Sequence, residues 1–353
     1  MVACEGRWYY FPPMSVVTRG LLVCLLLAPL GCGGGDDDDD DADDDGGVSD
    51  WQVVGQDQPA ALLSVWGSSE SDVWAVGGDP GDDGGPLVFH YEGGEWTRLD
   101  SGERGVDLWW VFGFEGGPVF MSGSAGTILR YQDGAFEKFT TPGVSIVFGM
   151  WGAAPDDVWA VGGNNGGGSG FVWRFDGSEW AAAELPADIT GEDTVWKVAG
   201  IAADDVWMSA TAAKTLHWNG SSLDAELVPG SGASLTSVGG NAERFIAVGG
   251  DIFGEIFENA GDGWESVLEP DELMVGVAVS DDQAYAVGHF GTILRRESDG
   301  WVADGEPATE ENLHAAWIDP AGGVWTVGGQ FDARPTTSGV LLHNGNVIEG
   351  SLP

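Results

Sequence analysis

The sequence predicts an all-β protein, a seven-bladed β-propeller whose blades are four-stranded antiparallel sheets. Three observations lead to this prediction: a strand-like stretch that recurs seven times, a turn that recurs in step with it, and an unusual composition. The 353 residues include 59 glycines and 18 tryptophans. This balance favours many short strands that are joined by tight turns around a bulky core.

The recurring stretch is DVWAVGG at Asp72–Gly78, which returns as DDVWAVGG at Asp156–Gly163. Its β-branched and aromatic residues are typical of a strand, and we expect it to be the second strand of each blade. The middle bulky residues of the seven copies lie 39 to 48 residues apart, which is the period of propeller blades. These anchor residues are Trp74, Phe120, Trp159, Trp207, Ile246, Tyr285 and Trp325.

A two-residue turn follows each copy and precedes the expected fourth strand. The pairs are Gly93-Gly94, Asp133-Gly134, Asp176-Gly177, Asn219-Gly220, Asp262-Gly263, Asp299-Gly300 and Asn344-Gly345. Such pairs predict type I′ hairpins, in which both residues have positive φ. A bulky residue follows each pair within three positions: Trp96, Phe136, Trp180, Leu223, Trp264, Trp301 and Val347.

The two ends of the predicted propeller, which spans residues 51–353, complement each other. The last unit ends soon after Val347, so its own fourth strand is short. Trp51–Val54, which precedes the first complete unit, has the residue pattern of a fourth strand but no blade of its own. We therefore expect Trp51–Val54 to pair with the last blade and to close the ring.

The N-terminal 31 residues predict a signal peptide. Residues 20–31 form an apolar run that is too short to span a bilayer comfortably, and Met14 gives a cleaner start to it than Met1. Leu30-Gly31-Cys32 at its end resembles the lipobox of bacterial lipoproteins, although Pro29 stands where that family prefers leucine. The resemblance implies cleavage before Cys32 and lipidation of Cys32. An ordinary secreted protein is the alternative.

Residues 32–50 predict a solvated tether, because ten aspartates, nine of them within residues 36–45, and several glycines leave nothing that could pack. The whole chain has a formal charge of −44, which disfavours nucleic-acid binding and adhesion of the protein surface to anionic lipid. The only cysteines are Cys4, Cys24 and Cys32, so the predicted propeller has no disulfide. Diffuse Ca²⁺ binding by the acidic residues stays open, but the sequence predicts no specific cofactor or metal site.

The repeats also resemble known propellers. Gly288–Trp301 and Ser122–Gly134 are similar to the G-x-x-G-x-I-x-R…DG repeats of sialidase-like and photosystem-assembly-type propellers, and the VWG…DVWAVG phrase resembles secreted bacterial propeller lipoproteins. The resemblance covers nearly all of residues 51–353 and implies the fold. The sialidase Asp-box is not reproduced, because Ser298–Trp301 is too compressed.

Most bulky and basic residues have structural interpretations. We expect the strand tryptophans to form the core, and one of Trp109 and Trp110 to be exposed near the axis, because neighbours on a strand point to opposite faces. His90, His217 and His343 share one third-strand position with Arg130, Arg174 and Arg295, which indicates a structural role. His289 replaces a loop residue and is a candidate for ligand contact.

Three loops between second and third strands are long: Asp79–Pro86, Asn164–Gly170 and Gln330–Gly339. In a propeller these loops emerge on one face, and loops carry function on rigid scaffolds. With His289, the candidate binding residues are Asp79, Asp82, Asp83, Asn164, Asn165, Asp332 and Arg334.

These observations predict a monomeric, lipid-anchored propeller of the bacterial cell envelope, outside the cytoplasm, that binds an envelope protein or a glycan without catalysis. A glycan-active hydrolase of sialidase-like ancestry is one alternative. A structural part of an envelope complex is another. The sequence names no ligand.

Overall fold

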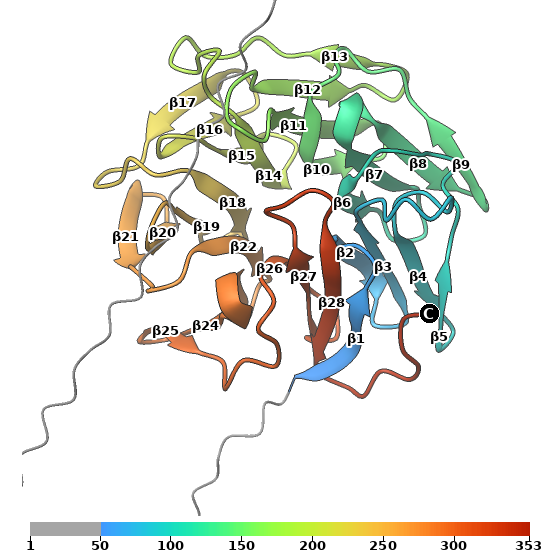
Figure 1. Cartoon of the computed structure of the whole chain (residues 1–353). Helices are drawn as coiled ribbons and strands as arrows, with labels where there is room; N and C mark the ends of the chain where they lie inside the picture. Colours follow the sequence, from blue (N-terminus) through green and yellow to red (C-terminus); the bar gives the residue numbers. More distant parts are fainter. Residues whose placement is uncertain (1–50) are drawn as a thin grey trace, which may run out of the picture. The chain divides into compact units, whose positions relative to one another are not determined.

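The computed structural model describes residues 51–353, and these residues form a seven-bladed β-propeller, as predicted (Figure 1). Every blade is a four-stranded antiparallel sheet. The predicted signal peptide, Cys32 and the acidic tether lie outside the described residues. Residues 51–353 contain no helix with the length and apolar character that a membrane span requires.

The first three blades follow one another along the chain, and the strands of each run in order from the axis outward. Blade 1 comprises β2 (Leu62–Ser69), β3 (Asp72–Gly77), β4 (Val88–Glu92) and β5 (Glu95–Arg98). Blade 2 comprises β6 (Leu108–Gly113), β7 (Val119–Gly123), β8 (Ile128–Gln132) and β9 (Ala135–Lys138), with the 3₁₀ turn η1 (Ser124–Gly126) between β7 and β8. Blade 3 comprises β10 (Ile146–Ala154), β11 (Asp157–Gly163), β12 (Phe171–Phe175) and β13 (Trp180–Ala182).

The remaining blades have the same order, except that the last one borrows a strand. Blade 4 comprises β14 (Val195–Ala202), β15 (Asp205–Ala210), β16 (Lys214–Trp218) and β17 (Leu223–Leu227). Blade 5 comprises β18 (Leu235–Gly240), β19 (Phe245–Gly250), β20 (Gly254–Asn259) and β21 (Trp264–Leu268). Blade 6 comprises β22 (Met274–Val279), β23 (Ala284–Gly288), β24 (Ile293–Glu297) and β25 (Gly300–Ala303), with η2 (His289–Gly291) between β23 and β24. Blade 7 comprises β26 (Leu313–Ile318), β27 (Val324–Gln330), β28 (Thr337–Asn344) and β1 (Gln52–Gln58).

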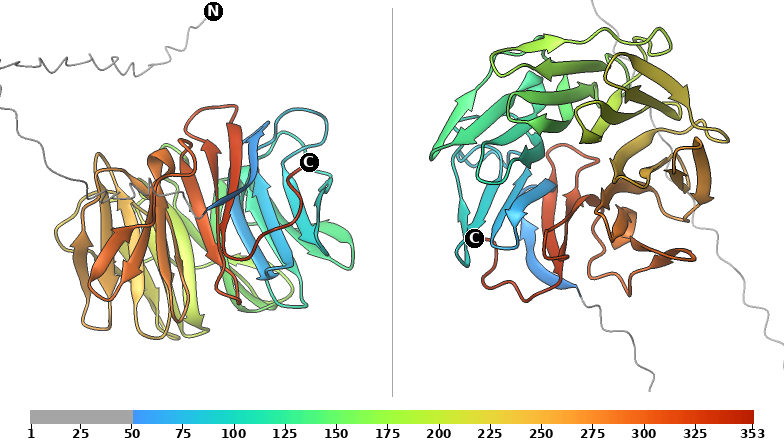
Figure 2. Two further views of the ribbon diagram at one scale, coloured as in Figure 1. Left: turned by 90° about the horizontal axis from the view of Figure 1, so that it is seen from below. Right: turned by 180° about the vertical axis from the view of Figure 1, so that it is seen from behind.

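The seven inner strands surround the propeller axis. Each packs against the inner strands of the two neighbouring blades, so the ring is continuous. The side view in Figure 2 shows the strands of the blades running between two faces that carry the loops. Since the strands alternate in direction, the loops between second and third strands share one face with the connections between blades.

The recurring stretch is the second strand of every blade, as expected, and its tryptophans fill the space between blades. Trp74 packs with Leu108 and Val119 of blade 2, and Trp325 packs with Leu62 and Val73 of blade 1. Seven of the eight tryptophans at repeated strand positions are buried and Trp301 is half-buried. The expected tryptophan core is therefore confirmed.

The shared position of histidines and arginines on the third strand is structural, as expected. It faces the anchor residue across the ladder: Trp74 pairs with His90, Trp207 with His217 and Trp159 with Arg174. The rings of Trp74 and His90 stack 3.8 Å apart, and His90 Nε2 lies 2.7 Å from an oxygen of Asp72. The pKa of Asp72 is lowered mainly by this hydrogen bond.

The prediction of seven type I′ hairpins is wrong for five blades. Both turn residues have positive φ only at Gly93-Gly94 and Asp133-Gly134. In blades 3 and 4 the side chains of Asp176 and Asn219 accept backbone hydrogen bonds from within four-residue loops. Asp176 and Asn219 therefore satisfy the loop backbone without positive φ at their own positions.

The turns of the last three blades differ again from the prediction. In blades 5 and 6 the glycines Gly263 and Gly300 have positive φ, but the preceding Asp262 and Asp299 do not. Blade 7 has no strand after Asn344-Gly345, and Val347 is 85% exposed. The fourth strand of blade 7 comes from the N-terminal side of the propeller instead.

The predicted ring closure is confirmed. β1 pairs with β28 in antiparallel register, with Gln52 opposite His343 and Val53 opposite Leu342. The Gln52 side chain makes two further hydrogen bonds, to the backbone nitrogen and oxygen of Ile348, at 2.9 and 2.8 Å. The residues that follow β28 are thus fastened to the closing strand β1.

Deleting Trp51–Gly55 should lower the melting temperature by roughly 5 °C or more, because it removes the outer strand of blade 7 and opens the ring. Thermal unfolding followed by circular dichroism measures this loss. Deletion of Gly46–Asp50, an equally long segment, serves as the control and should leave the melting temperature unchanged. Equal melting temperatures for both deletions would contradict closure by β1.

Candidate functional site

A bulge recurs near the start of every inner strand. There the pairing with the second strand shifts by one residue, and one residue of the inner strand has no partner in the ladder. A bulge of this kind re-aims the side chain of the extra residue. The seven bulge residues are Leu63, Trp109, Phe148, Trp196, Thr236, Val275 and His314.

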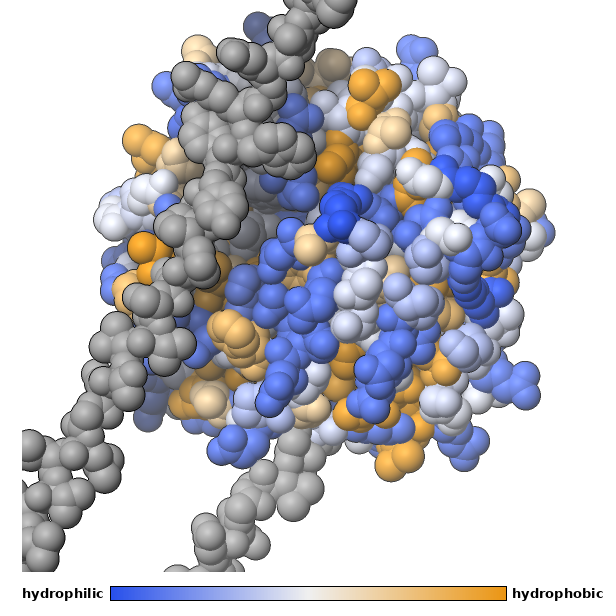
Figure 3. All heavy atoms as spheres, viewed as in Figure 1, coloured by the Kyte–Doolittle hydropathy of each residue, from blue (hydrophilic) through white to orange (hydrophobic). Residues whose placement is uncertain are grey.

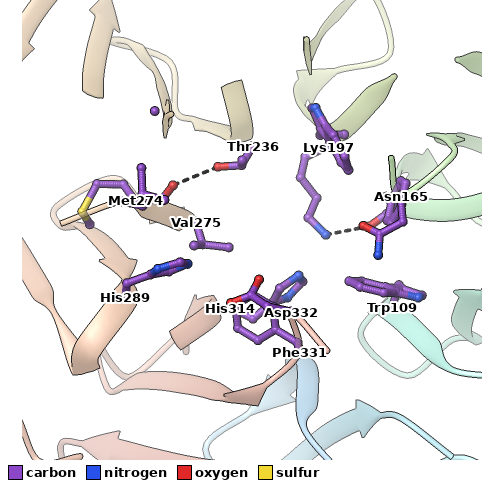
Figure 4. Close-up of a pocket in the computed structure, with 14 residues that line it drawn as sticks. Trp109, Asn165, Lys197, Thr236, Met274, Val275, His289, His314, Phe331 and Asp332 are labelled. Carbon is purple, nitrogen blue, oxygen red and sulfur yellow. Dashed lines mark hydrogen bonds between the residues drawn. The ribbon is translucent and has the colours of Figure 1, made fainter. Parts of the chain in front are cut away.

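Six of these seven residues line one cavity, which we call the axial pocket, and Leu63 belongs to the apolar cluster beside it. The cavity has a volume of about 310 Å³. Four residues from the segments between second and third strands also line it: Asn165, His289, Phe331 and Asp332 (Figure 4). Gly250, the last residue of β19, lies beside them in the wall. The pocket therefore lies on the face that carries the long loops.

Aromatic rings form much of the wall. The Trp109 and Phe148 rings meet edge to face at 5.2 Å, and the Phe148 and Trp196 rings are 5.0 Å apart. Phe331 packs edge to face against His314 at 4.9 Å, and the His314 ring lies 5.6 Å from the ring of Trp109. Rings that hold one another in this way form a rigid apolar surface for a ligand.

Lys197 is the one lysine or arginine among the described residues of this wall, and it is only 5% exposed. Its Nζ donates a hydrogen bond to the carbonyl oxygen of Phe148 at 2.7 Å and lies 4.2 Å from the centre of the Trp110 ring. Burial lowers the pKa of the Lys197 amine to about 7, because an ammonium ion loses its hydration there. Figure 4 shows the side chain reaching in among the lining residues.

Gly149 allows this path for the lysine. A Cβ atom at Gly149 would lie 3.1 Å from the Cα atom and 3.3 Å from the Cδ atom of Lys197. Lys197 of blade 4 therefore crosses the glycine of blade 3 to reach Trp110 of blade 2. A larger residue at this position would crowd the lysine.

His314 is neutral in this environment. Burial is the main cause that lowers the pKa of His314 to about 3, and the positive charge of Lys197 adds to the effect. Its Nδ1 donates a hydrogen bond to the carbonyl oxygen of Leu63. Nε2 therefore keeps its lone pair and can only accept a hydrogen bond.

Three of the candidate binding residues lie together at this pocket: Asn165, His289 and Asp332. They come from blades 3, 6 and 7, and Asp332 accepts a hydrogen bond from Asn312 at 3.1 Å. From the sequence we expected these residues on one face of the propeller, and in the structure they line the same cavity.

The other five candidates do not line the pocket. Asp79 accepts backbone hydrogen bonds from Gly81 and Gly105, and Asp82 forms an ion pair with Arg98 at 2.6 Å. These contacts hold the blade 1 loop together, and Asp83 is exposed on it.

The last two of these candidates belong to the loops of blades 3 and 7. The Asn164 side chain donates a hydrogen bond to the hydroxyl of Ser169 within its own loop. Arg334 pairs with Asp107 and lies 5.6 Å from the centre of the Trp109 ring. Arg334 thus lies close to the aromatic wall, while its charge is already matched by a carboxylate.

The sequence matches no protein-family model and no curated protein sequence. Solved structures do share its architecture. Virginiamycin B lyase from Staphylococcus aureus aligns with a TM-score of 0.66 at 14% identity, over 82% of this chain and 98% of the lyase. YCF48 from Cyanidioschyzon merolae aligns with a TM-score of 0.60 at 16% identity, over 84% of this chain and 99% of YCF48.

A structure of YCF48 bound to D1 peptide aligns with a TM-score of 0.61 at 14% identity, over 85% of this chain and 96% of that chain. These likenesses show the fold. At such low identities they carry no residue of a site from one protein to another.

The repeat pattern does not predict the bulge residues, although a signal for them exists in the sequence. Each lies 10 or 11 residues before the anchor residue of its blade, from Leu63 before Trp74 to His314 before Trp325. Their side chains vary from blade to blade, so no motif marks them. The expectation that Trp109 or Trp110 is exposed is wrong, because Trp109 is buried in the pocket wall and Trp110 is half-buried.

Within residues 51–353, no three His, Cys, Asp or Glu side chains gather in a way that could hold a metal ion. The expectation that the protein needs no cofactor remains a prediction.

Replacing Lys197 with methionine should change the pH dependence of stability. The folded protein holds the lysine pKa at about 7, below the value of 10.5 in the unfolded chain. Between these values the unfolded chain binds more protons, so the wild type gains stability as the pH rises, by up to about 1.4 kcal/mol per pH unit. Urea unfolding at several pH values from about 7 to 9.5 measures this gain.

The comparison uses the difference in unfolding free energy between wild type and Lys197→Met, because other titrating groups are common to both proteins. This difference should shift steadily in favour of the wild type as the pH rises. A difference that stays constant over this range would show that Lys197 titrates as an ordinary exposed lysine.

Proposed function

We propose that this protein is a lipoprotein of the bacterial cell envelope whose propeller binds a protein partner, without catalysis, through the face that carries the axial pocket. Cys32 is the proposed anchor, and residues 33–50 are the proposed tether between membrane and propeller. The observation that carries the binding proposal is a set of exposed apolar side chains beside the pocket.

These side chains are Ile252, Phe253 and Phe290, which we call the apolar rim. They are 80%, 62% and 66% exposed. Gly250 and His289, close to them in the chain, line the axial pocket. Hydrophilic residues cover most of the surface in Figure 3, so apolar side chains on neighbouring loops of one face favour a protein interface.

Phe290 strengthens this argument through its backbone. Its φ of 55° lies in the left-handed region, which costs an L-residue other than glycine roughly 1 kcal/mol. Ala125 occupies the same place in η1 with a φ of 57°. The repeat therefore requires this backbone conformation, but it does not require a phenylalanine at the position. A phenylalanine that is 66% exposed gains little from burial in the folded protein, and a binding role would account for it.

The peptide complex of YCF48 supports a propeller of this fold as a peptide-binding scaffold. A glycan-active hydrolase remains the alternative. Most glycosidases use a pair of carboxylates, and Asp332 is the one carboxylate among the described residues that line the axial pocket. We therefore favour binding over hydrolysis.

Crosslinking in cells tests the partner. A photoreactive amino acid at Phe290 should capture one constant envelope protein, and the substitutions Ile252→Ser and Phe253→Ser together should weaken its capture about tenfold or more. Leu227 is 70% exposed on β17 and serves as the matched control position. Equal capture from positions 227 and 290, or capture that the double substitution leaves unchanged, would contradict binding through the apolar rim.

Substitution of Cys32, the proposed site of lipidation, tests the proposed attachment to the membrane. Cys32→Ser should abolish labelling with palmitate and release the protein from the membrane fraction, because no other cysteine follows the signal peptide. Fractionation of cells that express each form measures this. Retention of the variant in membranes would contradict lipid anchoring.

A further inference from the structure

Lys197 differs from every other lysine and arginine in the propeller. Residues 51–353 contain eleven lysines and arginines. Within this described part of the chain, ten of them have a carboxylate within 4.0 Å, and Lys197 has none. The chain has 57 acidic residues, yet Lys197, the most deeply buried lysine or arginine of the propeller, has no carboxylate partner among the described residues.

The hydrogen bonds of Lys197 are also incomplete. An ammonium group can donate three hydrogen bonds, and the described residues accept one, at the carbonyl oxygen of Phe148. The Trp110 ring faces the same nitrogen. Two N–H groups remain in a wall of the axial pocket, where a buried charge is costly unless an anion joins it.

We infer that the axial pocket binds an organic carboxylate, with the carboxylate on Nζ of Lys197 and an apolar body against the aromatic wall. This inference rests on the proposed function, in which the pocket face is the binding face. A volume of about 310 Å³ suits a small organic acid or the last residue of a peptide. Trp109, Phe148 and Phe331 provide the apolar surface.

The other polar groups of the pocket favour a single negative charge. His314 is neutral and Asp332 repels a second anionic group, so the wall contains one cation for one carboxylate. His289 is the remaining titratable group among the described lining residues. A phosphate dianion would meet one lysine and several rings, which is a poor match.

Binding should depend on pH. A carboxylate ligand needs the ammonium form of Lys197, and burial lowers the pKa of that group to about 7 in the free protein. The bound anion stabilises the ammonium form and so raises this pKa. Affinity should fall as the pH rises above 7, as the lysine loses its proton.

The chain has three lysines, so NMR of lysine labelled with ¹³C at the ε position can follow Lys197 directly beside Lys138 and Lys214. The first probe pair is phenylacetate and its neutral isostere phenylacetamide. Phenylacetate should shift the Lys197 signal alone and raise its titration midpoint, and phenylacetamide should do neither. A second pair, Gly-Gly-Phe with a free or an amidated C-terminus, distinguishes a peptide end from a free acid as the source of the carboxylate.

Lys197→Met should weaken binding of the acid that shifts the signal by roughly tenfold to a hundredfold. Lys138→Met removes an exposed lysine and should leave it unchanged. The inference is wrong if neither acid moves the Lys197 signal, if acid and amide bind equally, or if Lys197→Met binds like the wild type. Crosslinking from Phe290 to a partner would survive each of these outcomes, so they leave the proposed function intact.

Discussion

The rest of the structure depends on the pairing of β1 with β28. Six blades form from consecutive strands, but the seventh lacks an outer strand until Gln52–Gln58 joins it. The closing strand is also held from outside its own ladder: the Trp51 indole donates to Asp304 of blade 6, and Leu352 packs in the core cluster between blades 7 and 1. A closed ring holds each inner strand between two neighbours, and only in a closed ring do seven bulges face one axis.

The axial pocket results from the sevenfold repeat of the backbone and from the different side chains at the seven bulge positions. The backbone repeats seven times, and the bulge puts one side chain per blade at the axis without regard to its type. In this structure the bulge positions combine three aromatic rings, Trp109, Phe148 and Trp196, with the imidazole of His314, whose ring centre lies 5.6 Å from that of Trp109. One position further along the inner strands, Gly149 leaves space that Lys197 occupies. The pocket thus needs no departure from the propeller backbone: six bulge residues line it, and Lys197, which follows the bulge of blade 4, adds the cation.

Much of the fold could be predicted from the sequence, because strands and turns repeat with a fixed period. The second strands, the tryptophan core and the closure by Trp51–Val54 follow from such local patterns. The turns were harder, since Asp176 and Asn219 form side-chain-capped loops from the same kinds of residue pair that form type I′ hairpins elsewhere. The loop face was predictable from loop length, and three of its residues reach the pocket. The role of Lys197 could not be predicted from the sequence. Lys197 is distinguished by having no carboxylate nearby, and only the folded structure shows which residues are its neighbours.

A closed ring, fastened by β1, holds the axial pocket in place. Hydrogen exchange of peptides that span Gln52–Gln58, followed by mass spectrometry, tests this dependence most directly. We expect the β1 amides to be protected at least as well as those of the outer strands β5 and β17, because they exchange only when the ring opens. Exchange of β1 at the rate of an unstructured chain, while the other blades stay protected, would contradict closure by this strand.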